Sequence, residues 1–99
     1  MQSSYAERFE RDMGCTEAEW LRWLPAAMGE HPWQRQGQSI SASIAPGTLQ
    51  LSWTQAEPRV IASARFPRLL VSFEFAHLGD AQRLQFMKRF DLYMQRGGG

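Results

Sequence analysis

The sequence predicts one small α+β domain in which two helices flank an antiparallel sheet. Three observations support this fold class. The chain has 99 residues, close to the common size of a single domain. Apolar residues recur at helical spacing near both ends, and they alternate with polar residues through the middle. The predicted order is α-β-β-β-β-α, a four-stranded antiparallel meander with the helices packed on one face.

The first 15 residues are expected to be an N-terminal extension or a short helix. Ser4 and Glu7 have the spacing of a capping box, which favours a helix from about Tyr5 to Met13. The alternative is that the ordered chain starts near Met13 and that residues 1–12 are a frayed extension.

A second capping box, formed by Thr16 and Glu19, indicates the start of the first long helix. Pro25 falls inside this helix, where its ring and missing N–H are expected to kink it or divide it, and Gly29 ends it. Residues 30–37 then form a connecting loop. The apolar residues of the helix share one face: Trp20, Leu21, Trp23, Leu24, Ala27 and Met28.

From Ser39 the hydrophobic period changes to two, which predicts a β-hairpin with Pro46 and Gly47 as its loop. In that register Ile44 faces Leu49. The first strand, residues 38–45, would lie at the edge of the sheet. The inward-facing residues of the hairpin are Ile40, Ala42, Ile44, Leu49, Leu51 and Trp53.

A second hairpin of the same layout is predicted after a break at Glu57 and Pro58, with its turn at Pro67 and Arg68. The opposite face of the sheet carries mainly serine, threonine, glutamine and arginine, and we expect it to face water. The inward-facing residues of this hairpin are Val60, Ala62, Ala64, Phe66, Leu69, Val71, Phe73 and Phe75.

The last predicted element is an amphipathic helix that begins at Asp80, a favourable N-cap, and ends near Gln95. Its apolar stripe should pack on the sheet, so that Trp53, Phe73, Phe75, Phe86 and Phe90 are buried together. The domain is expected to span residues 16–96, and residues 97–99 to form a flexible glycine tail.

Charge and cysteine content limit the classes of function. Residues 1–58 hold four basic and seven acidic residues (−3), whereas residues 59–99 hold seven basic and three acidic (+4). A basic C-terminal half is compatible with a polyanionic partner. Cys15 is the single cysteine, which excludes an internal disulfide and a multi-cysteine metal site. Without an apolar run of roughly 18 residues we expect no membrane partner, and we predict a cytoplasmic protein.

The sequence offers no catalytic constellation. His77 stands three residues before Asp80, but a histidine at the end of a strand is more often a local hydrogen-bonding residue than a base. His31 lies 46 positions away, so no metal-ligand spacing is present, and the scattered glycines form no phosphate loop. No cofactor is expected.

Three functions remain open. A non-enzymatic protein-interaction module or accessory subunit is favoured. The alternative is a nucleic-acid-binding domain that uses the basic C-terminal half, and the third is a small enzyme whose site is not visible in sequence. Leu92 is expected to be exposed among basic residues on the last helix, as in a partner contact. The candidate binding residues are Leu92, Lys88, Arg89, Arg96, Arg65 and Arg68.

Self-association through the first strand is a further hypothesis. An edge strand presents unpaired N–H and C=O groups, and residues 38–45 lack the lysine or internal proline that usually blocks edge pairing. Two copies would pair through the edge that carries Ser39, Ser41 and Ser43. The alternatives are that the N-terminal segment around Tyr5 and Phe9 covers this edge, or that the strand order is not a meander.

Overall fold

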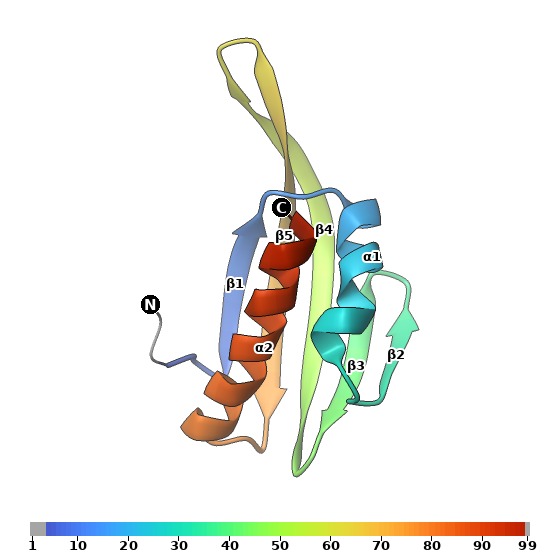
Figure 1. The fold of residues 1–99 in the computed structure, drawn as a ribbon, viewed down its shortest axis with the longest axis vertical. Helices are drawn as coiled ribbons and strands as arrows, with labels where there is room; N and C mark the ends of the chain where they lie inside the picture. Colours follow the sequence, from blue (N-terminus) through green and yellow to red (C-terminus); the bar gives the residue numbers. More distant parts are fainter. Residues whose placement is uncertain (1–3, 99) are drawn as a thin grey trace.

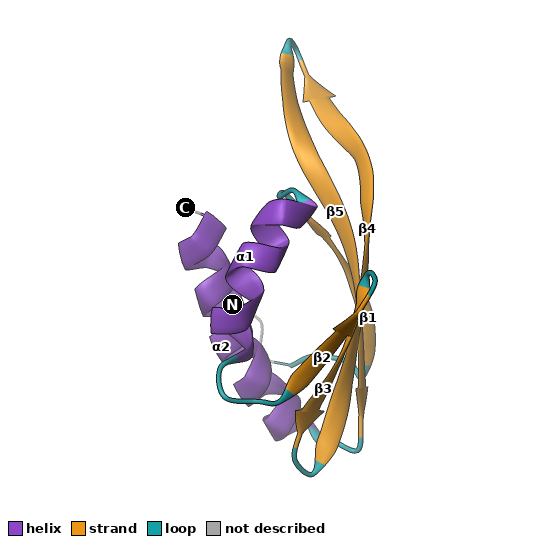
Figure 2. Ribbon diagram, turned by 90° about the vertical axis from the view of Figure 1, so that its right-hand side faces the viewer, coloured by secondary structure: helices purple, strands orange, loops and turns teal. Residues whose placement is uncertain are grey.

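The computed structural model describes residues 4–98 and shows two helices on one face of a five-stranded antiparallel sheet (Figures 1 and 2). The α+β class is confirmed, but the four-stranded count is wrong. The strand order is β1-β5-β4-β3-β2, so the two long strands β4 and β5 are central. The elements are β1 (Arg8–Met13), α1 (Glu17–Met28), β2 (Trp33–Gln36), β3 (Ser39–Ile44), β4 (Gly47–Ile61), β5 (Ala64–Ala76) and α2 (Asp80–Gly98).

The N-terminal segment forms strand β1 and not the expected short helix or frayed extension. It pairs antiparallel with β5, with Phe9 opposite Phe73. The two rings stack at 4.6 Å between centroids. The guanidinium of Arg11 lies over the same aromatic group, 5.5 Å from the Phe73 ring. Because a nine-residue helix is marginal without packing, these long-range contacts outweigh the capping signal.

The expected loop over residues 30–37 contains β2, which covers the outer side of β3. Gly37 adopts a left-handed φ of 62° in the tight turn between the two strands. Strand β3 is therefore an interior strand, and the prediction that it forms a sheet edge is wrong. Its serines, Ser39, Ser41 and Ser43, offer no free edge to a second copy, since β2 and β4 flank them.

The β3–β4 hairpin has the predicted faces but a register shifted by two residues. Its turn consists of Ala45 and Pro46, joined by a cis peptide bond, and Ile44 pairs with Gly47. Gly47 begins β4 in a position that accepts no side chain, because a Cβ there would meet the carbonyl oxygen of His77 at 2.8 Å. A shift of two keeps every inward-facing residue on the same side.

The predicted second hairpin does not exist as such. Strand β4 continues through Pro58 to Ile61, and β5 returns from Ala64, with Ala62 and Ser63 as the turn. Pro58 falls at a register irregularity between Ala56 and Arg59, the kind of site where a sheet tolerates proline. The expected inward positions at this end are exposed, Val60 at 58% and Phe66 at 48%.

Both helices begin where they were predicted, but Asp80 is the first residue of α2 and not its N-cap, since the first backbone hydrogen bond of the helix runs from the Arg83 N–H to the carbonyl of Gly79. Thr16 and Glu19 form the reciprocal capping box of α1, and Gly29 caps its end. Pro25 does not divide α1, since buried residues on either side of it, Leu24 and Met28, pack both parts against the core. Helix α2 extends to Gly98, past its expected end near Gln95. The glycine tail prediction falls partly on residue 99, outside the described residues.

The core lies between the helices and the inner face of the sheet. Trp53, Phe73, Phe75, Phe86 and Phe90 are all buried, as predicted. Phe73 meets Phe90 edge to face with centroids 5.4 Å apart, and Phe75 meets Phe86 in the same way at 5.9 Å. These pairs fix α2 over β5.

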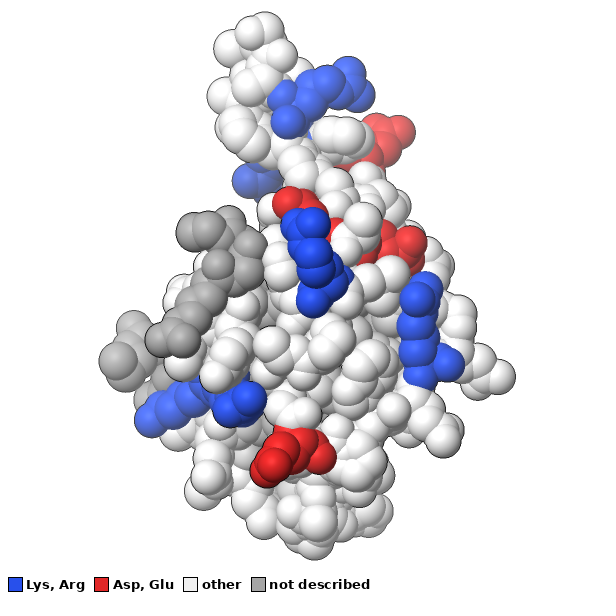
Figure 3. Space-filling model, turned by 45° about the vertical axis from the view of Figure 1, so that its right-hand side comes forward, with Lys and Arg blue, Asp and Glu red and all other residues white. Residues whose placement is uncertain are grey.

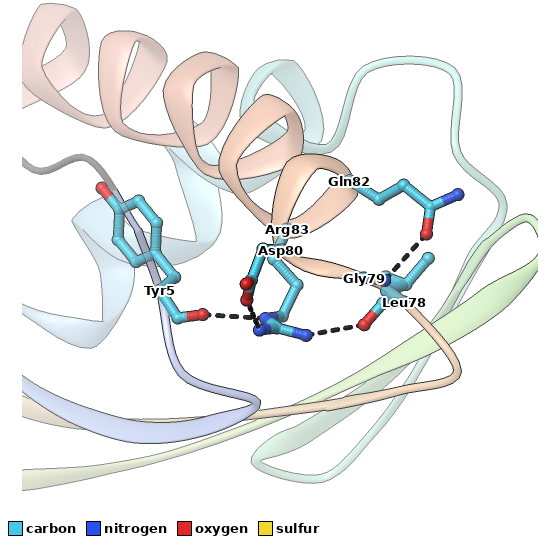
Figure 4. Close-up of polar contacts among 6 residues, drawn as sticks. All are labelled: Tyr5, Leu78, Gly79, Asp80, Gln82 and Arg83. Carbon is cyan, nitrogen blue, oxygen red and sulfur yellow. Dashed lines mark hydrogen bonds and ion pairs between the residues drawn. The ribbon is translucent and has the colours of Figure 1, made fainter.

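A buried arginine joins the N-terminal segment to the start of α2 (Figure 4). The guanidinium of Arg83 donates to the backbone carbonyl of Tyr5 at 2.8 Å and to that of Leu78 at 2.6 Å, and it pairs with the carboxylate of Asp80. Each of the three guanidinium nitrogens thus has an oxygen partner, which is the condition under which a charged group is tolerated inside a protein.

Candidate interaction surface

The ends of β4 and β5 project from the body as a two-stranded arm, which we define as residues 55–68. Strand β1 borders β5 only as far as Leu69, and β3 borders β4 only as far as Ser52. Figures 1 and 2 show the arm extending beyond both helices, so that neither helix covers it. Both faces of the arm are therefore open.

The arm carries most of the exposed large apolar side chains in the described part of the chain. Val60, Ile61 and Phe66 lie on it, and Leu70 lies at its base. Leu92 on α2 is the remaining one, at 44% exposure, which confirms its predicted exposure. Scattered surface leucines need no explanation, but apolar residues gathered on one projecting element do.

Ile61, Phe66 and Leu70 share the outer face of the sheet, the face without helices. Phe66 pairs with Arg59, and Ile61 pairs with Ala64, so these side chains point to one side. Because side chains alternate along β5, Phe66 and Leu70 point to the face of the sheet away from the buried Leu69. On this face lies a cavity of about 220 Å³, here called the arm pocket; it is lined by Asp12, Gly14, Arg59, Ile61, Phe66, Pro67 and Arg68.

Two arginines meet one carboxylate at the rim of the arm pocket. Arg68 donates from Nε to Asp12 Oδ2 at 2.9 Å, and its Nη2 forms an ion pair with the same oxygen at 2.8 Å. Arg59 Nη2 lies 3.6 Å from the same oxygen. The hydrogen bond from Arg68 lowers the pKa of Asp12, which keeps this carboxylate charged. The rim therefore has two positive charges and one negative charge.

Hydrogen bonds at the base hold the arm to the rest of the fold. The side-chain amide of Gln55 donates to the backbone carbonyl of Arg68 at 2.8 Å and accepts from the backbone N–H of Glu17 at 2.9 Å. The Glu17 carboxylate in turn accepts from the Trp53 indole at 2.8 Å, a contact that lowers the pKa of Glu17. The start of α1 thus braces the base of the arm.

The structure does not bring the predicted binding residues together. Arg65 and Arg68 lie on the arm, whereas Lys88, Arg89 and Leu92 lie on α2, which packs on the inner face of the sheet. The side chain of Arg96 is outside the described residues. Arg89 is used within the fold, since its guanidinium lies 4.5 Å from the centroid of the Tyr93 ring.

The basic residues form no continuous surface on the face shown in Figure 3, where uncharged areas and acidic side chains separate them. Many of the arginines are paired with acids. Arg8 contacts Glu74 at 3.4 Å, and Arg11 pairs with Asp91. Such pairing reduces the positive field available to a polyanion.

Sequence reasoning missed Ile61 and Phe66 as site residues because it placed Phe66 in the core. One signal was available: Val60 and Ile61 are adjacent apolar residues and must point to opposite faces of a strand. A strand end that is apolar on both faces is either fully buried or part of a contact surface.

One cavity has a cysteine and an aspartate in its lining, but neither is poised for catalysis. A cavity of about 320 Å³ is lined partly by Arg11, Cys15 and Asp91. Burial raises the pKa of the Cys15 thiol to about 11, so the thiolate needed for nucleophilic attack is scarce near neutral pH. Asp91 is occupied by Arg11 and by the hydroxyl of Tyr5, which donates to it at 2.8 Å. Within residues 4–98 no three His, Cys, Asp or Glu side chains cluster in a way that would hold a metal ion.

Neither described helix has both the length and the hydropathy needed to cross a membrane. No family model, no curated protein and no solved structure matches this chain.

Proposed function

We propose that this protein is a non-enzymatic protein-interaction module that binds its partner through the arm. The observation that carries the proposal is the grouping of exposed Val60, Ile61 and Phe66 on a hairpin that projects beyond the core. Exposed apolar groups concentrated on one element are characteristic of a contact surface.

The energetics of the arm support this proposal. A two-stranded ribbon without a packed face is marginally stable in water. Covering a half-exposed residue such as Ile61 or Phe66 contributes about 1 kcal/mol from apolar burial alone. A partner that covers the arm would therefore stabilise the paired strands of the arm, and the same burial would contribute to binding affinity. The braced base formed by Gln55 and Glu17 limits the ordering cost of such binding.

The nucleic-acid alternative has weaker support. Phosphate binding needs arginines that are free to contact the nucleic-acid backbone, but Arg68 already donates to Asp12 and Arg11 is paired with Asp91. A gel shift with random single- and double-stranded oligonucleotides at rising salt tests this alternative, because phosphate-driven binding must weaken steeply with salt.

Site-specific photo-crosslinking in an extract of the source cells tests the proposal. A photoreactive phenylalanine replaces Phe66 in one variant and Leu92 in the other; both positions are exposed, so both variants should fold. We expect the position-66 variant to form a discrete crosslinked protein adduct, and the position-92 variant to form none. The same adduct should form when the purified partner replaces the extract. Adding Ile61→Glu to the position-66 variant should remove it.

Three crosslinking results would contradict binding through the arm. Equal crosslinking at positions 66 and 92, or an adduct that survives Ile61→Glu, would show that the arm is not the contact site. Absence of any specific adduct at position 66 would also contradict the proposal.

A further inference from the structure

The arm pocket has the size of a site for one side chain. Its volume of about 220 Å³ is below the roughly 300–1,000 Å³ typical of small-molecule sites. Its apolar wall consists of Ile61, Phe66 and Pro67. An apolar side chain from a partner would fill such a pocket and cover the two exposed residues.

The net charge of the arm indicates which residues should flank the partner's apolar side chain. The arm holds three arginines, Arg59, Arg65 and Arg68, against one acid, Glu57, which gives +2. Asp12 at the rim reduces this to +1. Two copies that met arm to arm would bring like charges together, which disfavours a second copy as the occupant. An acidic segment has the complementary charge.

Arg59 is the group available to hold a carboxylate of the partner. Its side chain is 61% exposed and lies 3.6 Å from Asp12 Oδ2, beyond hydrogen-bond distance. Arg68, by contrast, already donates a hydrogen bond from Nε to that oxygen, and its Nη2 lies 2.8 Å from it. The guanidinium of Arg59 therefore keeps donors for a second acid beside the apolar wall.

Strand addition is disfavoured as the binding mode. Each strand of the arm contains a proline, Pro58 in β4 and Pro67 in β5. Proline has no N–H to donate to an added strand, and its presence near an edge is a common block to edge pairing. Recognition must then come from side chains on the outer face.

We propose that the arm pocket receives an apolar side chain of an acidic segment in a partner protein, with a neighbouring carboxylate of that segment paired to Arg59. This inference rests on the proposed function and specifies the partner's chemistry. Apolar contact with Ile61 and Phe66 supplies affinity, and the arginine selects for acidic neighbours.

Selection from a random peptide library tests this inference without knowledge of the natural partner. Phage displaying random peptides of about twelve residues are selected on the immobilised wild-type protein, after removal of those that bind the Phe66→Ser variant. We expect enriched peptides to place aspartate or glutamate next to a large apolar residue. A synthetic copy of an enriched peptide should bind about tenfold or more weakly to Phe66→Ser and to Arg59→Gln, and equally well to the control Leu92→Ser.

Several outcomes would overturn the inference. Enriched peptides that are apolar but neutral or basic would leave the arm as a contact site and remove the acidic partner. Peptide binding that is insensitive to Arg59→Gln would also remove the acidic partner and leave the arm as a contact site. Failure to enrich any Phe66-dependent peptide would reject the arm pocket as a peptide site. A homodimer by light scattering that Phe66→Glu dissociates would assign the surface to a second copy, and salt-sensitive oligonucleotide binding lost in Arg59→Gln would assign it to nucleic acid. The crosslinking experiment decides the proposed function independently, because it depends on position 66 and not on the partner's charge.

Discussion

Gly47→Ala provides the sharpest test of the fold at its central hairpin. An added Cβ would lie 2.8 Å from both the carbonyl oxygen of His77 and Cγ of Leu78, and closer still to the carbonyl oxygen of Ala76. Two of these three atoms belong to the backbone at the end of β5 and in the turn that follows it, which cannot move aside as a flexible side chain would. Overpacking in a well-packed core costs about 1–3 kcal/mol, and rigid neighbours favour the upper end.

We therefore expect Gly47→Ala to lose about 3 kcal/mol of unfolding free energy, measured by urea titration with tryptophan fluorescence. The corresponding fall in Tm is roughly 12–24 °C for a domain of this size. Gly14→Ala is the matched control, because nothing lies within 4 Å of a Cβ at that position. Its stability should change by no more than about 1 kcal/mol. A loss below about 1 kcal/mol for Gly47→Ala would refute the close approach of β4 to the β5–α2 turn.

Three further outcomes follow from burial and charge. Phe73→Ala should lose roughly 3–5 kcal/mol in the same titration, since its fully buried ring contacts Phe9 and Phe90; a loss near 1 kcal/mol would place it outside the core. Leu92→Glu should leave the Tm nearly unchanged, and a large fall would mean that α2 is rotated about its axis. Because the pKa of Cys15 is raised to about 11 in the fold, the unfolded chain loses this proton first as pH rises, so stability should decline between about pH 9 and 11. Cys15→Ala should flatten that decline relative to wild type, and identical pH profiles would contradict the raised pKa.

Local patterns predicted the parts of the fold that depend on local physics. The capping box at Thr16 and Glu19 located α1, because both hydrogen bonds form within four residues. Period-two alternation assigned Trp53 and Phe73 to the buried face, and a register error of two left that assignment intact.

The errors arose where long-range contacts decide the structure. Phe9 belongs to a strand because it stacks on Phe73, 64 positions later, and no local signal contains that pairing. Pro58 and Pro67 resembled strand breaks, yet both lie in long strands whose outer sides have no neighbour at that level. A proline is disruptive where a neighbouring strand needs its N–H, and it is tolerated at open edges and bulges. The candidate site lies on this misassigned segment, which is why Val60 and Phe66 were mistaken for core.

Because β4 and β5 continue from the core into the arm, the length of the arm can change without a change in the core. Removing one cross-strand pair at the base of the arm, such as Ala56 with Arg68, would shorten the arm by about 3.4 Å. It would also turn every residue beyond that point to the opposite face, because side chains alternate, whereas removing two successive pairs would restore the faces. Arm lengths that preserve the outer apolar face therefore come in steps of two pairs, about 7 Å each. Engineered variants of this protein can therefore differ in arm length by such steps while the rest of the sheet and the helices stay unchanged.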